Sequence, residues 1–340
     1  PRLLENGLHI VAHHEELNKE DAAFVDRYFA DNVYPVLTPM AVDSSRPFPL
    51  IRNKSLNLGA LVTKKNGNGE LEFATVQVPS VLSRIVLIPS EKEKKVILLE
   101  EVIERNIHKL FLNYDIVCTY PFRIMRNADL TIEEEEAEDL LEEIEKQLKK
   151  RQWGQAIRLE VEEGIDSRLL KIIKEELAVE KEDIYAIKGP LDLKFLMKMY
   201  GLEGFDNLKE HSYLPPQPVP ELPEDADVFE KIREGDILMH HPYQTFEPVV
   251  RFIRQAAKDK DGLAIKQTLY RGSGNSPIIA ALEQAAENGK QVSVLVELKA
   301  RFDEENNIVW AKKLEKAGCH VIYGLVGLKT HSKITLVVRR

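Results

Sequence analysis

The spacing of hydrophobic positions predicts mixed secondary structure in the first two thirds of the chain. Residues 55–63 and 71–78 have a strand-like composition and flank the turn residues KKNGNG, which predicts a hairpin. Residues 156–162 alternate between apolar and polar positions, whereas SRLLKIIKEEL at 167–177 has apolar residues at helical spacing. We therefore expect an α+β domain here.

An acidic segment interrupts this region. Thr131 and Glu134 match a capping box, and the run EEEEAEDLLEEIEKQLKKR follows. The run carries an apolar stripe at helical spacing, which consists of Leu140, Leu141, Ile144 and Leu148. We expect a helix whose carboxylates form a solvated face, because the run offers charge but no metal-ligand spacing.

A proline-rich stretch divides the chain. Five prolines lie within residues 215–223, and proline restricts the backbone and removes hydrogen-bond donors. We predict an α+β head domain at 1–214, an extended linker at 215–224 and a second domain at 225–340. An ordered surface loop within one domain is the alternative.

After the linker the pattern becomes strand–helix–strand. Strands are expected at 263–270, 291–298, 320–325 and 332–338. Ser276 and Pro277 are suited to begin the first intervening helix, and Gly289 to end it. The second helix carries Ile308, Val309, Ala311 and Leu314 and ends at Gly318. This alternation predicts an α/β sheet that is parallel through its βαβ units, with covered faces.

Composition and charge narrow the class of protein. The chain has 340 residues, a net charge of −9 and no apolar run long enough for a membrane helix. Cys118 and Cys319 are far apart, which predicts reduced thiols and a cytoplasmic location. The negative charge argues against a polyanion partner. However, residues 251–340 hold 16 Lys+Arg and 9 Asp+Glu, a charge of 16 − 9 = +7.

This basic region contains a candidate phosphate site. Arg271 directly follows the first predicted strand and Arg301 follows the second, so both could face the crevice where open α/β sheets bind ligands. Guanidinium groups suit phosphate because they stay charged and donate in a planar fork. The loop at 272–275 then leads into a helix N-terminus, which favours anions. Taken singly, these features are also typical of surface ion pairs and turns.

The segment GLKTHSKITLVV carries a candidate nucleophile. His331 and Lys333 are two residues apart at the start of a predicted strand, so they would point to the same face. A neutral imidazole can attack phosphorus, while the ammonium favours that neutral form and binds phosphoryl oxygens. An ordinary loop histidine is the alternative, because a motif this short recurs by chance.

Longer motifs resemble one family. The segments are HHPYQTFEPVVRFIRQAA (240–257), AIKQTLYR (264–271), VELKARFDEENNIVWAKKLEKAG (296–318), GLKTHSKI (327–334) and the upstream YPVLTPMAVD…RPFPLIRNKSLNLGALV (34–62). They resemble bacterial polyphosphate kinase, a family with phospholipase D-like catalytic domains. The resemblance covers nearly all of the chain, including the head domain and the first part of the first catalytic domain.

This resemblance implies specific roles. His331 would be the phosphohistidine nucleophile with Lys333 beside it, and Arg271 and Arg301 would bind phosphate and the associated Mg²⁺. The substrates would be ATP or ADP and inorganic polyphosphate, with no nucleic acid. The family further implies a homo-oligomer, either a dimer or a tetramer. Its location would be cytoplasmic, with peripheral association at the inner face of the membrane as a variant.

The resemblance also implies what the chain does not contain. A second catalytic domain and the adenine-contacting residues would lie past Arg340, so we expect this chain to be a fragment that is inactive alone. A phospholipase D-type phosphodiesterase or phosphatidyl transferase is a rival, but its His-x-Lys-x4-Asp motif would need Asp where the chain has Val338. A non-catalytic polyphosphate-binding scaffold is another rival.

His240 and His241 could form a metal pair, although loop packing is favoured.

Overall fold

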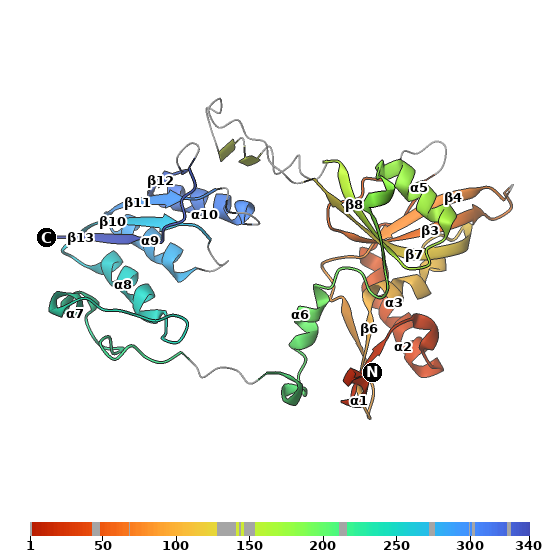
Figure 1. Cartoon of the computed structure of the whole chain (residues 1–340), viewed down its shortest axis with the longest axis horizontal. Coiled ribbons are helices and arrows are strands. Elements are labelled where there is room, and N and C mark those ends of the chain that lie inside the picture. Colours follow the sequence, from red (N-terminus) through yellow and green to blue (C-terminus); the bar gives the residue numbers. More distant parts are fainter. Residues whose placement is uncertain are drawn as a thin grey trace. The chain divides into compact units, whose positions relative to one another are not determined.

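The chain folds into two compact units (Figure 1). The computed structural model describes residues 2–42, 48–67, 69–127, 141–142, 144–145, 154–210, 216–271, 276–298, 300, 303–324 and 328–340. The first unit comprises residues 1–129 and 150–209, and the second comprises 130–149 and 210–340. The chain therefore leaves the first unit and returns to it before continuing into the second.

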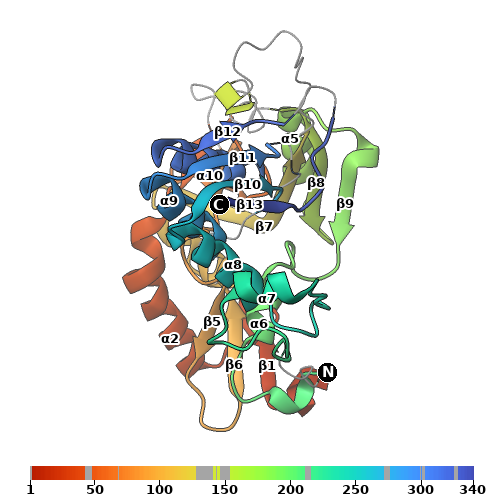
Figure 2. The same cartoon turned by 90° about the vertical axis from the view of Figure 1, so that its left-hand side faces the viewer.

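The first unit is built on two sheets. Its helices are α1 (Arg2–Glu5), α2 (Lys19–Tyr28), α3 (Leu99–Arg105), α5 (Ser167–Leu177) and α6 (Phe195–Tyr200). Its strands are β1 (Leu8–Val11), β2 (Met40–Val42), β3 (Leu56–Lys64), β4 (Leu71–Gln77), β5 (Ile85–Ile88), β6 (Lys94–Leu98), β7 (Tyr114–Arg126), β8 (Ala156–Glu162) and β9 (Ile184–Ile187). Among the described residues the larger sheet has the strand order β2-β4-β3-β7-β8-β9, and the smaller sheet has the order β1-β6-β5. The strands of the smaller sheet run beside one another in Figure 2.

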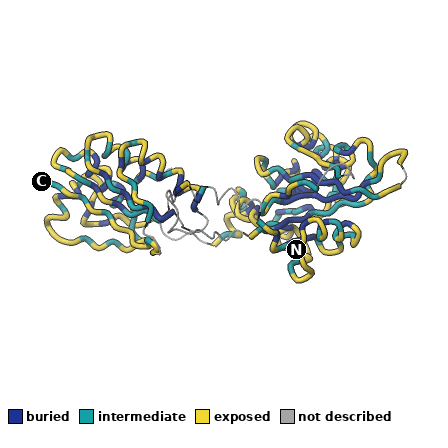
Figure 3. The backbone as a smooth tube through the Cα atoms, turned by 90° about the horizontal axis from the view of Figure 1, so that it is seen from above, coloured by how far each residue is buried: buried dark blue, intermediate teal, exposed yellow. Residues whose placement is uncertain are grey.

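The larger sheet is covered on both faces. Strand β3 is buried at its first seven positions, and Figure 3 shows buried segments in the interior of this unit. Leu58 and Val62 pack into one core with Val102 of α3, whereas Leu61 packs into another with Ile173 of α5. Strands β3 and β4 pair antiparallel as the predicted hairpin, and β8 and α5 form at the predicted positions.

The second unit is a four-stranded sheet with helices. Its helices are α7 (Val228–Glu234), α8 (Glu247–Lys258), α9 (Pro277–Glu287) and α10 (Glu304–Lys316), and its strands are β10 (Gly262–Leu269), β11 (Gln291–Val296), β12 (His320–Ile322) and β13 (Thr335–Arg339). In the part of the unit that is described, the strand order is β12-β11-β10-β13. The predicted βαβ units are confirmed, since β10, β11 and β12 are parallel, whereas β13 is antiparallel to β10.

One face of this sheet carries the helices. The two successive crossovers advance in the same direction, so right-handed connections place α9 and α10 on the same side. Val294 packs there with Leu282 of α9 and Leu314 of α10. The expectation that the described faces are covered is wrong for the opposite face, where Ile322, Leu336 and Val338 are 40%, 50% and 37% exposed.

The ends of these helices follow the sequence signals in part. Ser276 is the N-cap residue of α9 and Pro277 its first residue, but the Ser276 side chain makes no capping hydrogen bond. Gly289 and Gly318, after α9 and α10, have φ angles of +82° and +91°, where glycine is favoured. Val309, one of the apolar residues named for the second helix, is 59% exposed on α10.

The acidic segment contributes to the second unit. Residues 141–142 and 144–145 are helical, with Leu141 and Ile144 buried in the core of that unit. The Glu145 carboxylate pairs with Lys312 of α10. The rest of the predicted helix, including Thr131, Glu134, Leu140 and Leu148, lies outside the described residues. The described portion thus has one buried apolar side, as the stripe predicts.

Residues 216–224 pack against the second unit. Val219 and Leu222 are buried in a small cluster with Val228 of α7, and the Gln217 N–H donates to the Tyr243 carbonyl at 2.8 Å.

Cys118 and Cys319 are free thiols, and burial raises the pKa of Cys319 to about 11. Nowhere in the described ranges is a helix long and apolar enough to cross a membrane.

A buried ion pair in the first unit generates a prediction about stability. Arg123 of β7 and Glu160 of β8 are directly paired across the sheet, with Nη1 and Oε2 3.0 Å apart and both residues buried. Glu160→Ala should lower the free energy of unfolding by about 3 kcal/mol, because it leaves a buried guanidinium with incomplete compensation. Chemical denaturation measures this change.

The control is Glu175→Ala on α5, which removes an exposed pair with Lys171. It should cost about 0.5 kcal/mol or less. Equal losses for the two variants would contradict the assignment of the Arg123–Glu160 pair as a stabilising element of the sheet.

Candidate active site

The site lies where β13 joins the edge of β10. The two strands pair antiparallel, with Gln267 opposite Thr335. Just past this pairing the Thr268 hydroxyl donates to the Ser332 carbonyl at 2.8 Å and accepts from the Ile334 N–H at 2.9 Å. These bonds fix the segment before β13 alongside the end of β10, which bears Tyr270 and Arg271.

His331 and Lys333 converge on the Tyr270 ring. The imidazole meets this ring edge to face, with centroids 4.8 Å apart and an interplanar angle of 86°. The Lys333 Nζ lies 4.5 Å from the same centroid, and its ammonium donates to the His331 carbonyl. Strand β13 begins at Thr335, so the predicted start at residue 332 is wrong, but contact with one ring still brings the two side chains together.

Arg271 lies next to this ring. It is exposed just past β10, with its Cζ 5.3 Å from the Tyr270 centroid and its Nε 2.9 Å from the Asp303 carboxylate. Lys329 adds another cation, since its Nζ is 5.6 Å from the Tyr270 centroid. Arg301 and the loop 272–275 lie outside the described residues. The described part of the site therefore combines one imidazole with three cationic groups.

Buried polar groups hold these exposed side chains from behind. Glu297 directly follows β11 and is buried. Its carboxylate accepts a hydrogen bond at 2.7 Å from the N–H of Thr330, the residue before His331. The buried Asn307 amide of α10 donates to the carbonyls of Tyr270 and Glu297 at 2.8 and 2.7 Å. Four separate chain segments are thereby joined through two side chains, which limits the motion of the exposed groups.

Sequence reasoning did not identify Tyr270, Lys329, Glu297 and Asn307 as site residues. Tyr270 immediately precedes Arg271 at a strand end, and that position was a usable signal. A carboxylate at the position of Asp303 is also typical of a helix start. Asp303 precedes α10, with Glu304 in the first turn, and it also pairs with Arg271. Glu297 and Asn307 carried no signal, because their partners are backbone atoms of distant segments.

His240 and His241 pack within their own loop. Their rings lie 5.0 Å from Tyr243 and 5.3 Å from Phe246, both edge to face. The His241 Nδ1 is 3.0 Å from the Gln244 carbonyl oxygen. These contacts agree with the loop-packing alternative.

The arrangement can bind an anion beside a nucleophile. Lys329, Lys333 and Arg271 are exposed around one aromatic ring and could each donate to phosphate oxygens. The His331 imidazole lies within the same group and is exposed, so an incoming phosphorus atom could reach a ring nitrogen. The geometry therefore suits transfer of a phosphoryl group.

Two family comparisons cover most of the chain. The polyphosphate kinase middle domain matches residues 20–199, and polyphosphate kinase C-terminal domain 1 matches residues 227–340. Both matched domains belong to polyphosphate kinase, a phosphotransferase family. The chain belongs to the polyphosphate kinase family.

Individual relatives agree with this assignment. Polyphosphate kinase from Halalkalibacterium halodurans is 54% identical over 100% of this chain and 48% of the relative, and that from Bacillus cereus is 57% identical over 96% and 47%. The crystal structure of polyphosphate kinase from Porphyromonas gingivalis is similar, with a TM-score of 0.77, 27% identity and coverage of 100% of this chain and 49% of that one. The chain spans about half the length of the relatives it matches.

The buried support generates a prediction about local stability. Glu297→Ala should accelerate amide hydrogen exchange at residues 328–334 about tenfold, because the Thr330 N–H loses its buried carboxylate acceptor. Mass spectrometry of the exchanged 340-residue chain measures this. Glu305→Ala, at an exposed position of α10, is the matched control and should leave exchange there unchanged. Unchanged exchange in a folded Glu297→Ala variant would contradict the role of Glu297.

The far end of β13 generates a prediction about pH. The Asp259 carboxylate pairs with Arg339, and this hydrogen bond holds the pKa of Asp259 below its usual value. A lowered folded-state pKa stabilises the fold above the unfolded pKa of about 4, and the contribution is lost as pH falls through the folded pKa. Asp259→Asn should therefore lower the melting temperature at pH 7, and the deficit should shrink by pH 3. Asp261→Asn, at an exposed neighbour, should show neither effect; a deficit independent of pH would contradict the pairing.

Proposed function

We propose that the whole protein is a polyphosphate kinase that transfers the γ-phosphate of ATP reversibly to inorganic polyphosphate through a phosphohistidine at His331. One observation carries this proposal: the exposed His331 imidazole and Lys333 ammonium contact the same half-buried Tyr270 ring, beside Arg271 at a strand end. Membership of the polyphosphate kinase family supports the choice of substrates.

In the first step, a ring nitrogen of His331 attacks the γ-phosphorus in line. The N–P bond forms, the bond from phosphorus to the bridging oxygen breaks, and its electron pair leaves with ADP. Lys333 and Arg271 neutralise charge on the equatorial oxygens, where charge must be accommodated during transfer. Arg301 is assigned the same role from its place in the sequence.

In the second step, a terminal oxygen of polyphosphate attacks the phosphorus of the phosphohistidine. The N–P bond breaks, and the chain becomes one unit longer while the imidazole is regenerated. Running both steps backwards makes ATP from ADP and polyphosphate. Tyr270 acts as a support here, since its ring holds His331 and Lys333 together through both steps.

Mg²⁺ fits this site through phosphate oxygens. The described groups around Tyr270 are mostly cationic, and Asp303, the carboxylate beside them, pairs with Arg271. Mg²⁺ prefers oxygen ligands and commonly binds substrate phosphates, so Arg271 and Arg301 would hold the phosphates to which the ion would bind. When bound, the ion neutralises phosphate charge.

The family also supports the wider organisation that we propose. Residues 1–214, apart from the acidic segment 130–149 that belongs to the second unit, would be the head domain, and 225–340 the first part of a phospholipase D-like domain. The protein would be a cytoplasmic homo-oligomer. The phosphodiesterase alternative lacks a carboxylate at position 338, because Val338 occupies that place on β13, opposite Ala264.

The test is activity of the full-length parent protein. His331→Ala should lower kcat by at least about 10³-fold in both directions, because no other group replaces a covalent nucleophile. His320→Ala is the matched control, since it removes another exposed histidine of the same sheet. It should leave kcat within about twofold.

A His331→Ala enzyme that retains more than a tenth of the activity would overturn the assignment of the nucleophile. Circular dichroism should show that both variants remain folded, as expected for exposed positions. Turnover of phosphodiesters by the wild type in the absence of ATP would instead favour the phosphodiesterase class.

A further inference from the structure

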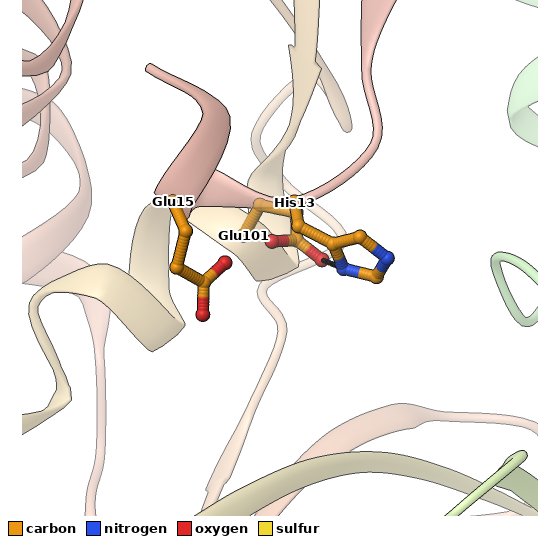
Figure 4. Close-up of side chains that lie close together, drawn as sticks. All are labelled: His13, Glu15 and Glu101. Carbon is orange, nitrogen blue, oxygen red and sulfur yellow. Dashed lines mark ion pairs between the residues drawn. The ribbon is translucent and has the colours of Figure 1, made fainter. Parts of the chain in front are cut away.

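A second group of chemically active side chains lies in the first unit, and no step of the phosphoryl transfer uses it. His13 precedes the short 3₁₀ helix η1 (His14–Glu16), which carries Glu15 and rests beside Glu101 in the first turn of α3. Figure 4 shows the imidazole of His13 directed at the Glu101 carboxylate, with Glu15 beside them.

The donor atoms are close enough for one ion. One nitrogen or oxygen from each of His13, Glu15 and Glu101 lies within 4.8 Å of the other two. The His13 Nδ1 is 3.9 Å from the Glu101 Oε1. Ligands of a metal with bonds of about 2.1 Å lie at most about 4.2 Å apart, so small side-chain rotations complete the geometry. His13 and Glu15 can make these rotations because their side chains are 60% and 72% exposed.

Glu101 is held in place by the backbone. Its Oε2 accepts from the His14 N–H at 2.9 Å and lies 3.4 Å from the His14 Nδ1, whereas its Oε1 is directed toward His13. The residue is only 9% exposed. A buried ligand fixed by an outer hydrogen bond, with two exposed ligands around it, is a typical arrangement for a metal site.

The carboxylates of the group contact histidines, and the His14 Nδ1 lies 3.4 Å from an oxygen of both Glu15 and Glu101. Within the described ranges, no lysine or arginine forms an ion pair with Glu15, Glu101 or Glu104. A bound cation would supply the missing positive charge.

We propose that His13, Glu15 and Glu101 bind one divalent transition-metal ion of the zinc class, at a site separate from the phosphoryl-transfer site. The mixed donor set selects the ion: imidazole nitrogen with carboxylate oxygen suits Zn²⁺, whereas Mg²⁺ prefers oxygen and water. Three protein ligands leave a fourth tetrahedral position for water. His13 and Glu15 belong to the N-terminal segment and Glu101 belongs to α3, so the ion joins these two parts of the unit.

The test is titration of the 340-residue chain with ZnCl₂ by calorimetry, without nucleotide or phosphate. One equivalent should bind saturably. His13→Ala and Glu101→Gln should each weaken its Kd at least about tenfold, because each removes a ligand. At the same Zn²⁺ concentration, the melting temperature of the wild type should rise more than that of His13→Ala.

Three variants control for other binding. His108→Ala and Glu16→Gln alter exposed residues of the same unit, and His331→Ala alters the other site. All three should bind Zn²⁺ within about twofold of the wild type. Absence of a saturable equivalent, or full retention of it in His13→Ala, would overturn the proposal. His13 is exposed, so this outcome does not depend on the folding of Glu101→Gln.

Discussion

The antiparallel pairing of β13 with β10 is the constraint on which the candidate active site depends. It joins residues more than sixty positions apart and is extended by Thr268, whose hydroxyl bonds both Ser332 and Ile334. A slip by one residue would turn the paired side chains to the opposite face of the sheet. The buried side of β13, where Val337 faces the core opposite Ile265, sets the register against such a slip.

Exposed groups of the site are available to a ligand, and buried groups hold them in position. The cations and the imidazole are exposed, so a phosphate can reach them without a rearrangement of the protein core. The positions of these groups are set by hydrogen bonds beneath them. The buried Glu297 and Asn307 bond Thr330 and Tyr270 to the end of β11 and to α10. Ordering long side chains such as Lys333 costs conformational entropy, and contact with the Tyr270 ring accounts for part of that ordering before any ligand arrives.

Much of the fold and part of the site could be predicted from local patterns. The β3–β4 hairpin, α5 and the parallel strands β10 to β12 follow hydrophobic period and turn residues, which are local signals. His331, Lys333 and Arg271 were identified because their positions relative to predicted strands were informative.

The remainder depends on contacts that no local pattern encodes. Glu297 and Asn307 act through backbone atoms of other segments, and the start of β13 at Thr335 follows from its pairing with Gln267. The exposed face bearing Leu336 and Val338 was also missed, because strand alternation shows that two faces exist but not what covers each. The cluster around Glu101 joins segments nearly ninety residues apart and could not be read from spacing.

The most direct measurement of the central claim is the position of the phosphoryl group on the protein. The full-length parent enzyme, mixed briefly with ATP and quenched in alkali to preserve N–P bonds, should yield one phosphorylated peptide within this chain. Fragmentation should place the group on His331. A phosphoryl group on another residue of this chain, or an enzyme that turns over with His331 unmodified at every time point, would contradict the account.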